Sequence, residues 1–200
     1  MTTISTLQYL YPVLAYLLGS VPFGLILSKL FGNGKLRESG SKNIGATNVM
    51  RTQGKVLGFL TFFLDFAKGA IAIYFFQPDH ELVRLVVIAA PVAGHMFPVW
   101  LNFKGGKGIA TYFGILCALN MYVFFATALV WSFVFAISKT SSIAGLTSVI
   151  LSSVIFFFAE HKCNLVFFNQ LCVLIVLIVV IIVKHHDNIK RLIKKNELKM

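Results

Sequence analysis

The sequence predicts an all-α polytopic membrane protein with about seven transmembrane helices, organised as a single domain over residues 1–200. Hydrophobic residues make up 58% of the chain, and the mean hydropathy is +0.82. Only 12% of the residues are charged, whereas a soluble domain has about a quarter. Apolar runs long enough to cross the roughly 30 Å hydrocarbon core recur along the chain, which excludes a soluble globular class.

The chain is strongly basic, with 18 Lys and Arg residues against 7 Asp and Glu and a net charge of +11. These cations stand between the apolar runs rather than in one soluble patch. They therefore indicate the positive-inside bias of a membrane protein and contact with anionic partners, including membrane lipid. We expect no nucleic-acid partner.

The first predicted span covers residues 4–27 and carries no charge. A small-residue patch at 19–24 contains Pro22, which removes one helix hydrogen bond. The patch forms either a simple kink or the wall of a polar site. The connection that follows, residues 29–55, has six cations against one acid, Glu38, so we place it in the cytoplasm. Its length favours a functional role.

The second predicted span, residues 56–76, contains Asp65 and Lys68 three residues apart and therefore on one helical face. Ionisable groups inside a span are costly, so they mark either a functional site or a structural ion pair. We expect a structural pair that orients Arg51 or the first loop. A short acidic link, residues 77–84, suits the outside face.

The third span is predicted over residues 85–103, with His95 near its end. Residues 109–137 then form an uncharged stretch that is either one tilted span or two short ones breaking near Leu119 and Asn120. Two spans place the basic tail in the cytoplasm, whereas one span places it outside, against the positive-inside rule. We therefore expect two spans, of which the first is only about 11 residues long and must be buried in protein.

The last two spans are predicted at 143–158 and 165–183, joined by an outside link that holds Glu160, His161 and Lys162. This topology gives seven spans, with the N-terminus outside and the C-terminus in the cytoplasm. It also places three polar stretches on the cytoplasmic side: residues 39–51, residues 103–111 and the start of the tail, 184–192.

These three stretches are rich in the groups that bind phosphate. Glycine lets backbone N–H groups approach an anion, and Lys or Arg supplies charge. The turn Gly105-Gly106-Lys107-Gly108 precedes an apolar helix, although it is not a Walker A loop and alone could be a flexible basic turn. The tail could likewise be an interfacial helix on anionic lipid, or its histidines could transfer protons.

Other site types lack support in the sequence. There is no H-E-x-x-H motif, no carboxylate cluster and no Cys/His ligand set, so we expect neither a metal nor a cofactor. A G-x-S-x-G elbow is also missing, which leaves a serine-hydrolase triad unsupported. Direct transfer of a group between two bound substrates fits these residues better than a covalent intermediate.

Five motifs occur in a fixed order between the predicted spans. They read Gly19-Ser20-x-Pro22; Gly40-Ser41-x-Asn43-x-Gly45-Ala46-Thr47-Asn48-x-x-Arg51; Asp65-x-x-Lys68-Gly69; Gly94-His95-x-x-Pro98-x-x-x-x-Phe103-x-Gly105-Gly106-Lys107-Gly108-x-Ala110-Thr111; and Lys184-His185-x-x-Asn188-x-x-Arg191-Leu192. In this order, over nearly the whole chain, they resemble the bacterial acyl-phosphate:glycerol-3-phosphate acyltransferases of the PlsY family. Lys42 departs from the family pattern, in which that position is often glycine.

The resemblance implies a multi-pass protein of the bacterial cell (inner) membrane with its active site on the cytoplasmic side. It implies transfer of a fatty acyl group from acyl-phosphate, rather than acyl-CoA, to the sn-1 hydroxyl of glycerol 3-phosphate. The products are lysophosphatidic acid and phosphate, in the first acylation step of phospholipid biosynthesis. It also implies a functional link to an enzyme that forms acyl-phosphate, and it requires no metal.

The resemblance assigns roles to particular residues. Catalytic roles fall on His185, Asn188, Ser41 and Lys107. Substrate and phosphate binding falls on Ser41, Asn43, Thr47, Asn48, Arg51, Lys104, Gly105, Gly106, Lys107 and Gly108. Supporting roles fall on Ser20, Asp65, Lys68 and His95. For the base that takes the hydroxyl proton, His185, His95 and a substrate phosphate oxygen stay open, and we favour the substrate phosphate.

Two other function classes compete with the acyltransferase. A transporter or channel for an anionic metabolite is compatible with Asp65, Lys68 and His95 inside spans, although the sequence has no inverted repeat. A lipid-binding scaffold would leave the polar motifs inside the spans unexplained. The enzyme requires the three polar stretches on one face, whereas the transporter requires polar residues that are reachable from both faces.

Overall fold

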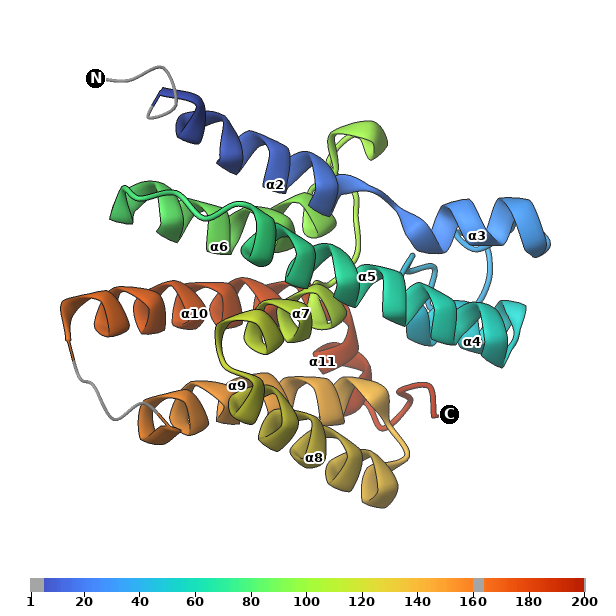
Figure 1. Ribbon diagram of the computed structural model, residues 1–200. Helices are drawn as coiled ribbons and strands as arrows, with labels where there is room; N and C mark the ends of the chain where they lie inside the picture. Colours follow the sequence, from blue (N-terminus) through green and yellow to red (C-terminus); the bar gives the residue numbers. More distant parts are fainter. Residues whose placement is uncertain (1–5, 160–163, 200) are drawn as a thin grey trace.

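A computed structural model describes residues 6–159 and 164–199, and every regular element in these ranges is helical. In chain order the elements are η1 (Gln8–Leu10), α2 (Tyr11–Ser20), α3 (Phe23–Phe31), α4 (Ala46–Gln53), α5 (Lys55–Phe75), α6 (Glu81–Met96), η2 (Val99–Leu101), α7 (Ile109–Leu119), α8 (Met121–Ser138), α9 (Ser141–Ala159), α10 (Leu165–Lys184) and α11 (His186–Ile193). Figure 1 shows the long helices lying side by side in one bundle. The expected link residues Glu160, His161 and Lys162 lie outside the described ranges.

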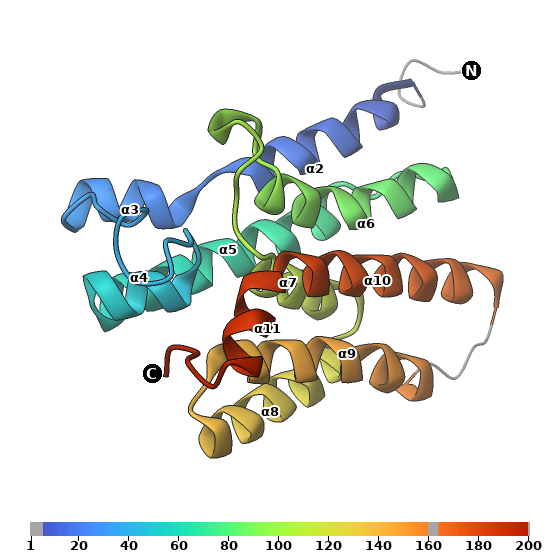
Figure 2. The same cartoon turned by 180° about the vertical axis from the view of Figure 1, so that it is seen from behind.

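Six segments of the described chain are long and apolar enough to cross a membrane, with α2 and α3 counted as one. The 11-residue α7 adds a shorter apolar helix. The described chain enters at one end of the bundle and leaves at the other, as both Figure 1 and Figure 2 show. This arrangement agrees with an odd number of crossings.

The uncharged stretch 109–137 divides as expected, because α7 ends at Leu119 and α8 begins at Met121. Asn120 adopts an extended backbone with φ −156°, and its side chain accepts hydrogen bonds from the N–H groups of Tyr122 and Val123. Asn120 therefore ends one helix and caps the next. The expected division into two helices is confirmed: α8 is long enough to cross a membrane, whereas the shorter α7 packs inside the bundle against α5, α6 and α8.

The first span is broken rather than kinked. Val21 is extended, and Pro22 precedes α3, so α2 and α3 are separate helices. The break leaves the Val21 carbonyl free of the regular helix pattern, and the Lys68 ammonium donates to it at 3.1 Å. The small-residue patch therefore interrupts the helix, and the interrupted backbone supplies an acceptor to a buried cation.

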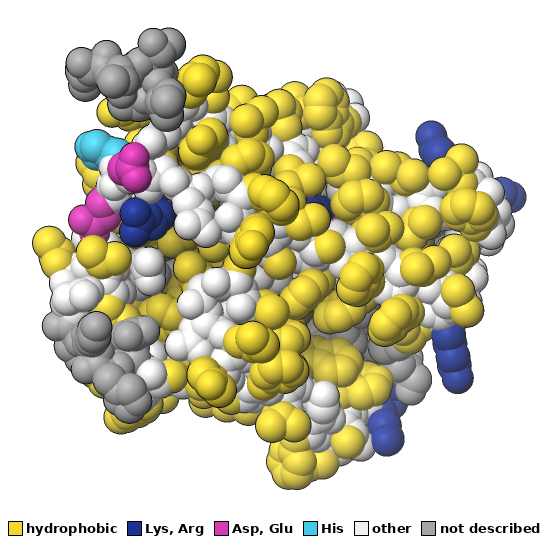
Figure 3. Space-filling model, in the orientation of Figure 1, with side chains coloured by type: hydrophobic (Ala, Val, Ile, Leu, Met, Phe, Trp, Pro, Cys, Tyr) yellow, Lys and Arg dark blue, Asp and Glu magenta, His cyan; other side chains and the backbone are white. Residues whose placement is uncertain are grey.

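Charged side chains separate to the two ends of the molecule, and apolar side chains cover most of the surface between them (Figure 3). The end that carries α3, α4 and the C-terminal segment holds most of the cations visible on this face. Two short helices at this end, α4 and α11, form parts of the polar stretches 39–51 and 184–192. Residues 46–53 form α4 within the connection that follows the first span, although their polar sequence is too short to predict a span.

Candidate functional site

A cavity of about 570 Å³ opens at the cation-rich end and is lined by residues from α4, α5, α7, α8, α9 and α11. Most of the predicted site residues line it, from all three polar stretches and from the spans: Ser41, Asn43, Thr47, Asn48, Arg51, Asp65, His95, Lys107, Gly108, His185 and Asn188. Five others do not: Ser20, Lys68, Lys104, Gly105 and Gly106. The three stretches thus converge at one end of the bundle, as the enzyme hypothesis requires.

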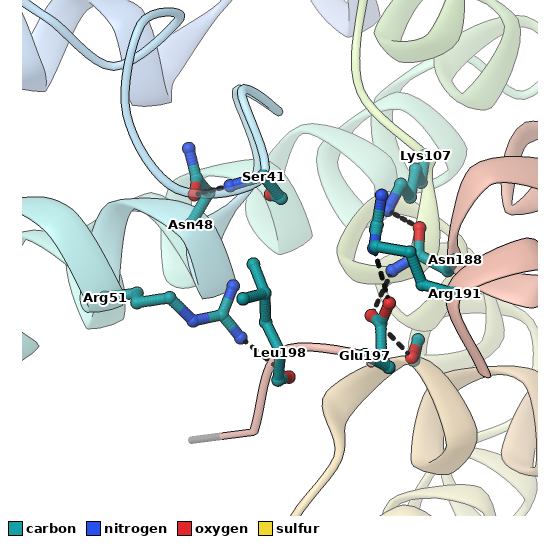
Figure 4. Close-up of polar contacts among 9 residues, drawn as sticks. Ser41, Asn48, Arg51, Lys107, Asn188, Arg191, Glu197 and Leu198 are labelled. Atoms are coloured by element: carbon teal, nitrogen blue, oxygen red, sulfur yellow. Dashed lines mark hydrogen bonds and ion pairs between the residues drawn. The ribbon is translucent and has the colours of Figure 1, made fainter. Parts of the chain in front are cut away.

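Asn48 organises the first loop from within. Its side-chain oxygen accepts the Ser41 N–H at 2.8 Å, and its Nδ2 donates to the carbonyls of Leu36, Ser39 and Asn43 at 3.2, 3.2 and 2.9 Å. The residue is only 2% exposed. Its amide is therefore occupied by the loop backbone and holds Ser41 at the cavity wall (Figure 4). The bond to the Asn43 carbonyl holds that residue as well, and direct substrate binding by Asn48 stays a prediction.

Lys42 adopts φ 59°, in the left-handed region that favours glycine. The family preference for glycine at this position therefore has a backbone reason. Lysine in place of glycine therefore costs backbone strain at position 42. The cavity wall stays intact, because the lysine side chain is exposed and the neighbouring Ser41 still lines the cavity.

Arg51 and Thr47 form the α4 side of the cavity. Thr47 Oγ1 lies 2.9 Å from Ser141 Oγ, which joins α4 to the start of α9. The Arg51 guanidinium donates to the Leu198 carbonyl at 3.2 Å, and burial lowers its pKa from the ordinary value. A partly buried guanidinium that faces a neutral carbonyl is a suitable binding group for an anion.

The glycine turn before α7 differs from the expected cradle. The N–H of Gly105 donates to the Met96 carbonyl at 3.1 Å, and that of Gly106 donates to the His95 carbonyl at 2.9 Å. A Cβ on Gly105 would collide with the His95 carbonyl, and one on Gly106 with His95 Nε2. These two glycines allow close packing on the end of α6, and their N–H groups are not available to an anion.

Gly108 and Lys107 are the parts of this turn that face the cavity. Gly108 has φ 87° and precedes α7, so the free N–H groups and positive dipole end of α7 lie at the cavity wall. Lys104, in contrast, is exposed, and its carbonyl accepts a hydrogen bond from Arg37 at 2.6 Å. Of the two lysines expected to bind phosphate, only Lys107 is in place.

Lys107 belongs to a group that we call the tail cluster: Lys107, Asn188, Arg191 and Glu197 (Figure 4). Lys107 donates to Asn188 Oδ1, and Asn188 Nδ2 donates to Glu197 at 2.5 Å. Arg191 Nε donates to the other Glu197 oxygen at 2.7 Å, and Ser142 Oγ adds a bond at 3.0 Å. The cluster joins α7, α9, α11 and the C-terminal segment.

Burial shifts the protonation of this cluster. It lowers the pKa of Lys107 to about 8, with the nearby Arg191 charge acting in the same direction. Burial would raise the pKa of Glu197, but hydrogen bonds from Arg191, Asn188 and Ser142 outweigh it and hold that pKa below the ordinary value. The Lys107 ammonium is thus poorly solvated and has no direct carboxylate contact within residues 6–159 and 164–199, which suits it to bind a phosphate.

His185 lies at the junction of α10 and α11 and is 2% exposed. Its Nδ1 is 2.8 Å from the Ile181 carbonyl. A carbonyl only accepts, so Nδ1 carries the proton and Nε2 presents a lone pair. Burial and the Lys107 charge lower the pKa of His185 to about 4, so the ring is neutral at neutral pH. It is therefore an acceptor for a hydroxyl group but a weak base.

Asp65, Lys68 and His95 form a second group, the inner cluster. Lys68 Nζ lies 2.8 Å from Asp65 Oδ1 and 2.8 Å from His95 Nδ1, in addition to its bond to the Val21 carbonyl. An ammonium has three donors, and these three acceptors use all of them. The pair's direct contacts are with the α2–α3 break and His95, so the expected orientation of Arg51 or the first loop by this pair stays a prediction. Ser20 donates to the Tyr16 carbonyl of its own helix and supports that break only locally.

His95 takes the opposite hydrogen-bonding role to His185. Because Lys68 donates to its Nδ1, the proton of the neutral ring lies on Nε2, next to Gly106. This tautomer provides no free lone pair, which argues against His95 as the base. His95 instead supports the turn that presents Lys107.

The other part of the cavity is apolar. Its walls come from Phe59 and Phe62 of α5, from Phe113 of α7, and from an α8 face that includes Phe124 and Trp131. The same cavity therefore joins a cationic end, rich in hydrogen-bond donors, to an aromatic groove. Such a site suits a molecule with a charged head and an apolar tail.

The polar-end cavity residues that were not singled out from the sequence include Ser141, Ser142, Glu197 and Leu198. One signal was available, because Glu197 is the only acid in the basic run 188–200. A lone carboxylate among cations favours pairing with them. The serines at the start of α9 follow an apolar span without any distinguishing pattern, and their position depends on tertiary contacts.

The fold and the cavity define a multi-pass integral membrane protein with a site for an amphiphilic anion. The profile of the family described as Glycerol-3-phosphate acyltransferase matches residues 9–195. The chain is 39% identical to the glycerol-3-phosphate acyltransferase of Pelagibacter ubique and 43% identical to that of Jannaschia sp.. These alignments cover 96% and 99% of this chain, and 98% and 95% of the relatives. The chain belongs to the glycerol-3-phosphate acyltransferase family.

Solved structures agree with this assignment. The fold is similar to that of crystalline PlsY, an integral membrane glycerol 3-phosphate acyltransferase, in its glycerol 3-phosphate form, with a TM-score of 0.87 and 39% identity. The form of PlsY with lysophosphatidic acid gives a TM-score of 0.85 and 38% identity. Each similarity covers 96% of this chain and 95% of the other.

Proposed function

We propose that this protein transfers a fatty acyl group from acyl-phosphate to the sn-1 hydroxyl of glycerol 3-phosphate, giving lysophosphatidic acid and inorganic phosphate. The observation that carries this proposal is the single cavity in which a cationic end adjoins an aromatic groove. Both substrates carry phosphate, and the donor also carries an apolar tail. The solved relatives, which have glycerol 3-phosphate and lysophosphatidic acid forms, support the same acceptor and product.

Two cations serve the two phosphates. Lys107, with the N-terminus of α7, binds on one side of the cavity, and Arg51 binds on the α4 side. Ser41, Asn43 and Thr47 supply neutral donors between them, in positions fixed by Asn48. A substrate phosphate at the Lys107 side replaces contacts now made within the tail cluster.

The chemistry requires alignment more than activation, because a mixed anhydride is already reactive. His185 Nε2 accepts a hydrogen bond from the attacking hydroxyl and orients it toward the acyl carbon. The hydroxyl oxygen forms the new C–O bond, the tetrahedral intermediate collapses, and the bond to phosphate breaks. Since an imidazole with a pKa of about 4 is a weak base at neutral pH, the proton passes to a substrate phosphate oxygen, whose pKa lies near 6.

The charge pattern supports a location and an orientation. The end that carries the cavity also carries the basic first loop and tail, so we assign it to the cytoplasmic face of the bacterial inner membrane. The N-terminus then lies outside. An acyl-phosphate-forming enzyme must supply the donor, and the apolar groove accepts it from the surrounding lipid.

The experiment that tests this proposal compares acyl donors. The purified protein in detergent or lipid is given palmitoyl-phosphate with and without glycerol 3-phosphate, and palmitoyl-CoA in parallel. Phosphate release that depends on glycerol 3-phosphate, matched by lysophosphatidic acid and with no use of the CoA ester, is the expected result. Use of palmitoyl-CoA, or the absence of lysophosphatidic acid from a folded and monodisperse sample, contradicts the proposal.

A further inference from the structure

The apolar groove has a defined length along α8. The α8 residues that line it include Phe124, Ala128, Trp131 and Phe135, spaced by three or four positions and therefore on one face of the helix. From Phe124 to Phe135 the helix rises by about 16 Å. This distance is close to half of the roughly 30 Å hydrocarbon core, the depth that one acyl tail occupies in one leaflet.

The two ends of the groove differ. Phe135 stands one turn before Lys139 and close in sequence to Ser141 and Ser142, which line the polar end of the cavity. Phe124 stands one turn after Asn120, where α7 stops and α8 begins. Because α7 begins at the cavity and rises by about 16 Å over its 11 residues, this break lies about half of the hydrocarbon core away from the polar end.

An aromatic wall closes the inner end of the groove. The ring of Phe124 lies 5.3 Å from that of Phe66 on α5 and 6.3 Å from that of Phe113 on α7, measured between centroids. Phe113 is buried, and the partly buried Phe66 packs against the bundle core, so moving either ring aside disturbs packing on α5 or α7. Ala128 lies between Phe124 and Trp131 on this face of α8, and its small side chain leaves the groove wide at that position.

We propose that Phe124 is the end stop that sets the longest acyl tail this enzyme accepts, and that Ala128 provides the width that lets the tail reach it. The proposal rests on the acyl transfer proposed above. A tail that extends beyond Phe124 must bend or displace aromatic rings from two neighbouring helices. A tail that ends at Phe124 fills the groove while its carbonyl stays at the polar end.

The test uses a series of saturated donors: lauroyl-, myristoyl-, palmitoyl-, stearoyl- and arachidoyl-phosphate. For the native protein, we expect kcat/KM to fall by about tenfold at the first tail that passes Phe124, the lower end of the discrimination that an apolar pocket achieves. Phe124→Ala should move this fall to longer tails by at least one member of the series. Ala128→Phe should move it to shorter tails.

Matched controls come from the lipid-facing side of the same helix. Phe133 is 68% exposed and Leu129 is 71% exposed, and neither lines the cavity. Phe133→Ala and Leu129→Phe should therefore keep the native order of donors. Ratios of kcat/KM between donors are taken within one preparation, so partial misfolding of a variant does not affect them.

The outcomes separate the two proposals. An active protein in which Phe124→Ala and Ala128→Phe both keep the native order overturns the end stop and leaves the acyl transfer standing. A native protein that uses none of the acyl-phosphates overturns the acyl transfer, and the end stop with it. Opposite shifts in the two variants, with unchanged controls, support the end stop.

Discussion

The inner cluster and the tail cluster both pair one carboxylate with neighbouring cations, but they differ in what their donors contact. In the inner cluster, Lys68 is 1% exposed and all three of its N–H groups have protein acceptors. In the tail cluster, the Lys107 ammonium contacts only a neutral amide among the described residues, and Glu197 lies near the end of the chain. From this difference we infer that the inner cluster maintains the fold and that the tail cluster binds substrate.

The two histidines make the same distinction. His95 has its Nδ1 occupied by a lysine and supports a turn, while His185 donates from Nδ1 to its own helix and keeps a lone pair on Nε2. Both residues line the cavity, so position alone does not separate their roles. The hydrogen bond that each ring makes at Nδ1 separates their roles.

The largest effect expected from this comparison comes from removing the charge of Lys68 in the inner cluster. Lys68→Met leaves Asp65 buried without a charge partner and should lower the free energy of unfolding by roughly 3–5 kcal/mol. The measurement is thermal unfolding in detergent, with Lys107→Met as the matched variant from the tail cluster, which should unfold near the native temperature. The double variant Asp65→Lys with Lys68→Asp should also be unstable, because Val21 and His95 need a donor at position 68. Native stability and full activity in that variant would contradict the structural role.

The next largest effect concerns His185. His185→Ala should lower kcat by about 10² because the hydroxyl loses its acceptor, whereas His185→Gln, which keeps an acceptor, should stay within about tenfold of the native enzyme. Steady-state kinetics with varied glycerol 3-phosphate measure both. Equal losses of 10²–10⁴ in the two variants, with KM unchanged, would instead identify His185 as the base.

A smaller effect is expected at Glu197. Glu197→Gln keeps neutral hydrogen bonds but loses the charged contact with Arg191, which should cost about 2 kcal/mol and a few degrees of melting temperature. Since the folded-state pKa of Glu197 is below its ordinary value of 4.5, its stabilisation is present above that pH and is lost as the pH falls. An acid titration of melting temperature that is the same in the variant and the native protein would contradict this role.

The smallest expected effect is a pH dependence. Lys107, with a pKa of about 8, is cationic below that pH and loses its charge as the pH rises through it. In the free enzyme, kcat/KM for glycerol 3-phosphate should therefore fall by about tenfold per pH unit above that value. Lys107→Arg should move the fall to higher pH, after correction for spontaneous hydrolysis of the donor. An unmoved alkaline limb in that variant would assign the titration to another group.

The sequence predicted the spans well, because hydropathy and charge are properties of single segments. The break at Asn120 followed from the charge of a tail more than sixty residues away. Residue type did not reveal, however, whether a polar group faces the cavity or the surrounding protein. Asn48 and Gly106 have the chemistry expected of ligand-binding groups, yet tertiary contacts occupy their polar groups. The position of Glu197 between α9 and α11 likewise depends on how the chain end folds back, which no local pattern encodes.

The measurement that tests the central claim most directly uses the two lysines of one turn. Lys107 lines the cavity, whereas Lys104 is exposed three residues away and does not. Calorimetric binding of glycerol 3-phosphate should weaken at least tenfold in Lys107→Met, as expected for a lost charge-assisted contact, and stay within about twofold of native in Lys104→Met. Equal weakening in both variants, or none in Lys107→Met, would contradict the assignment of this cavity as the substrate site.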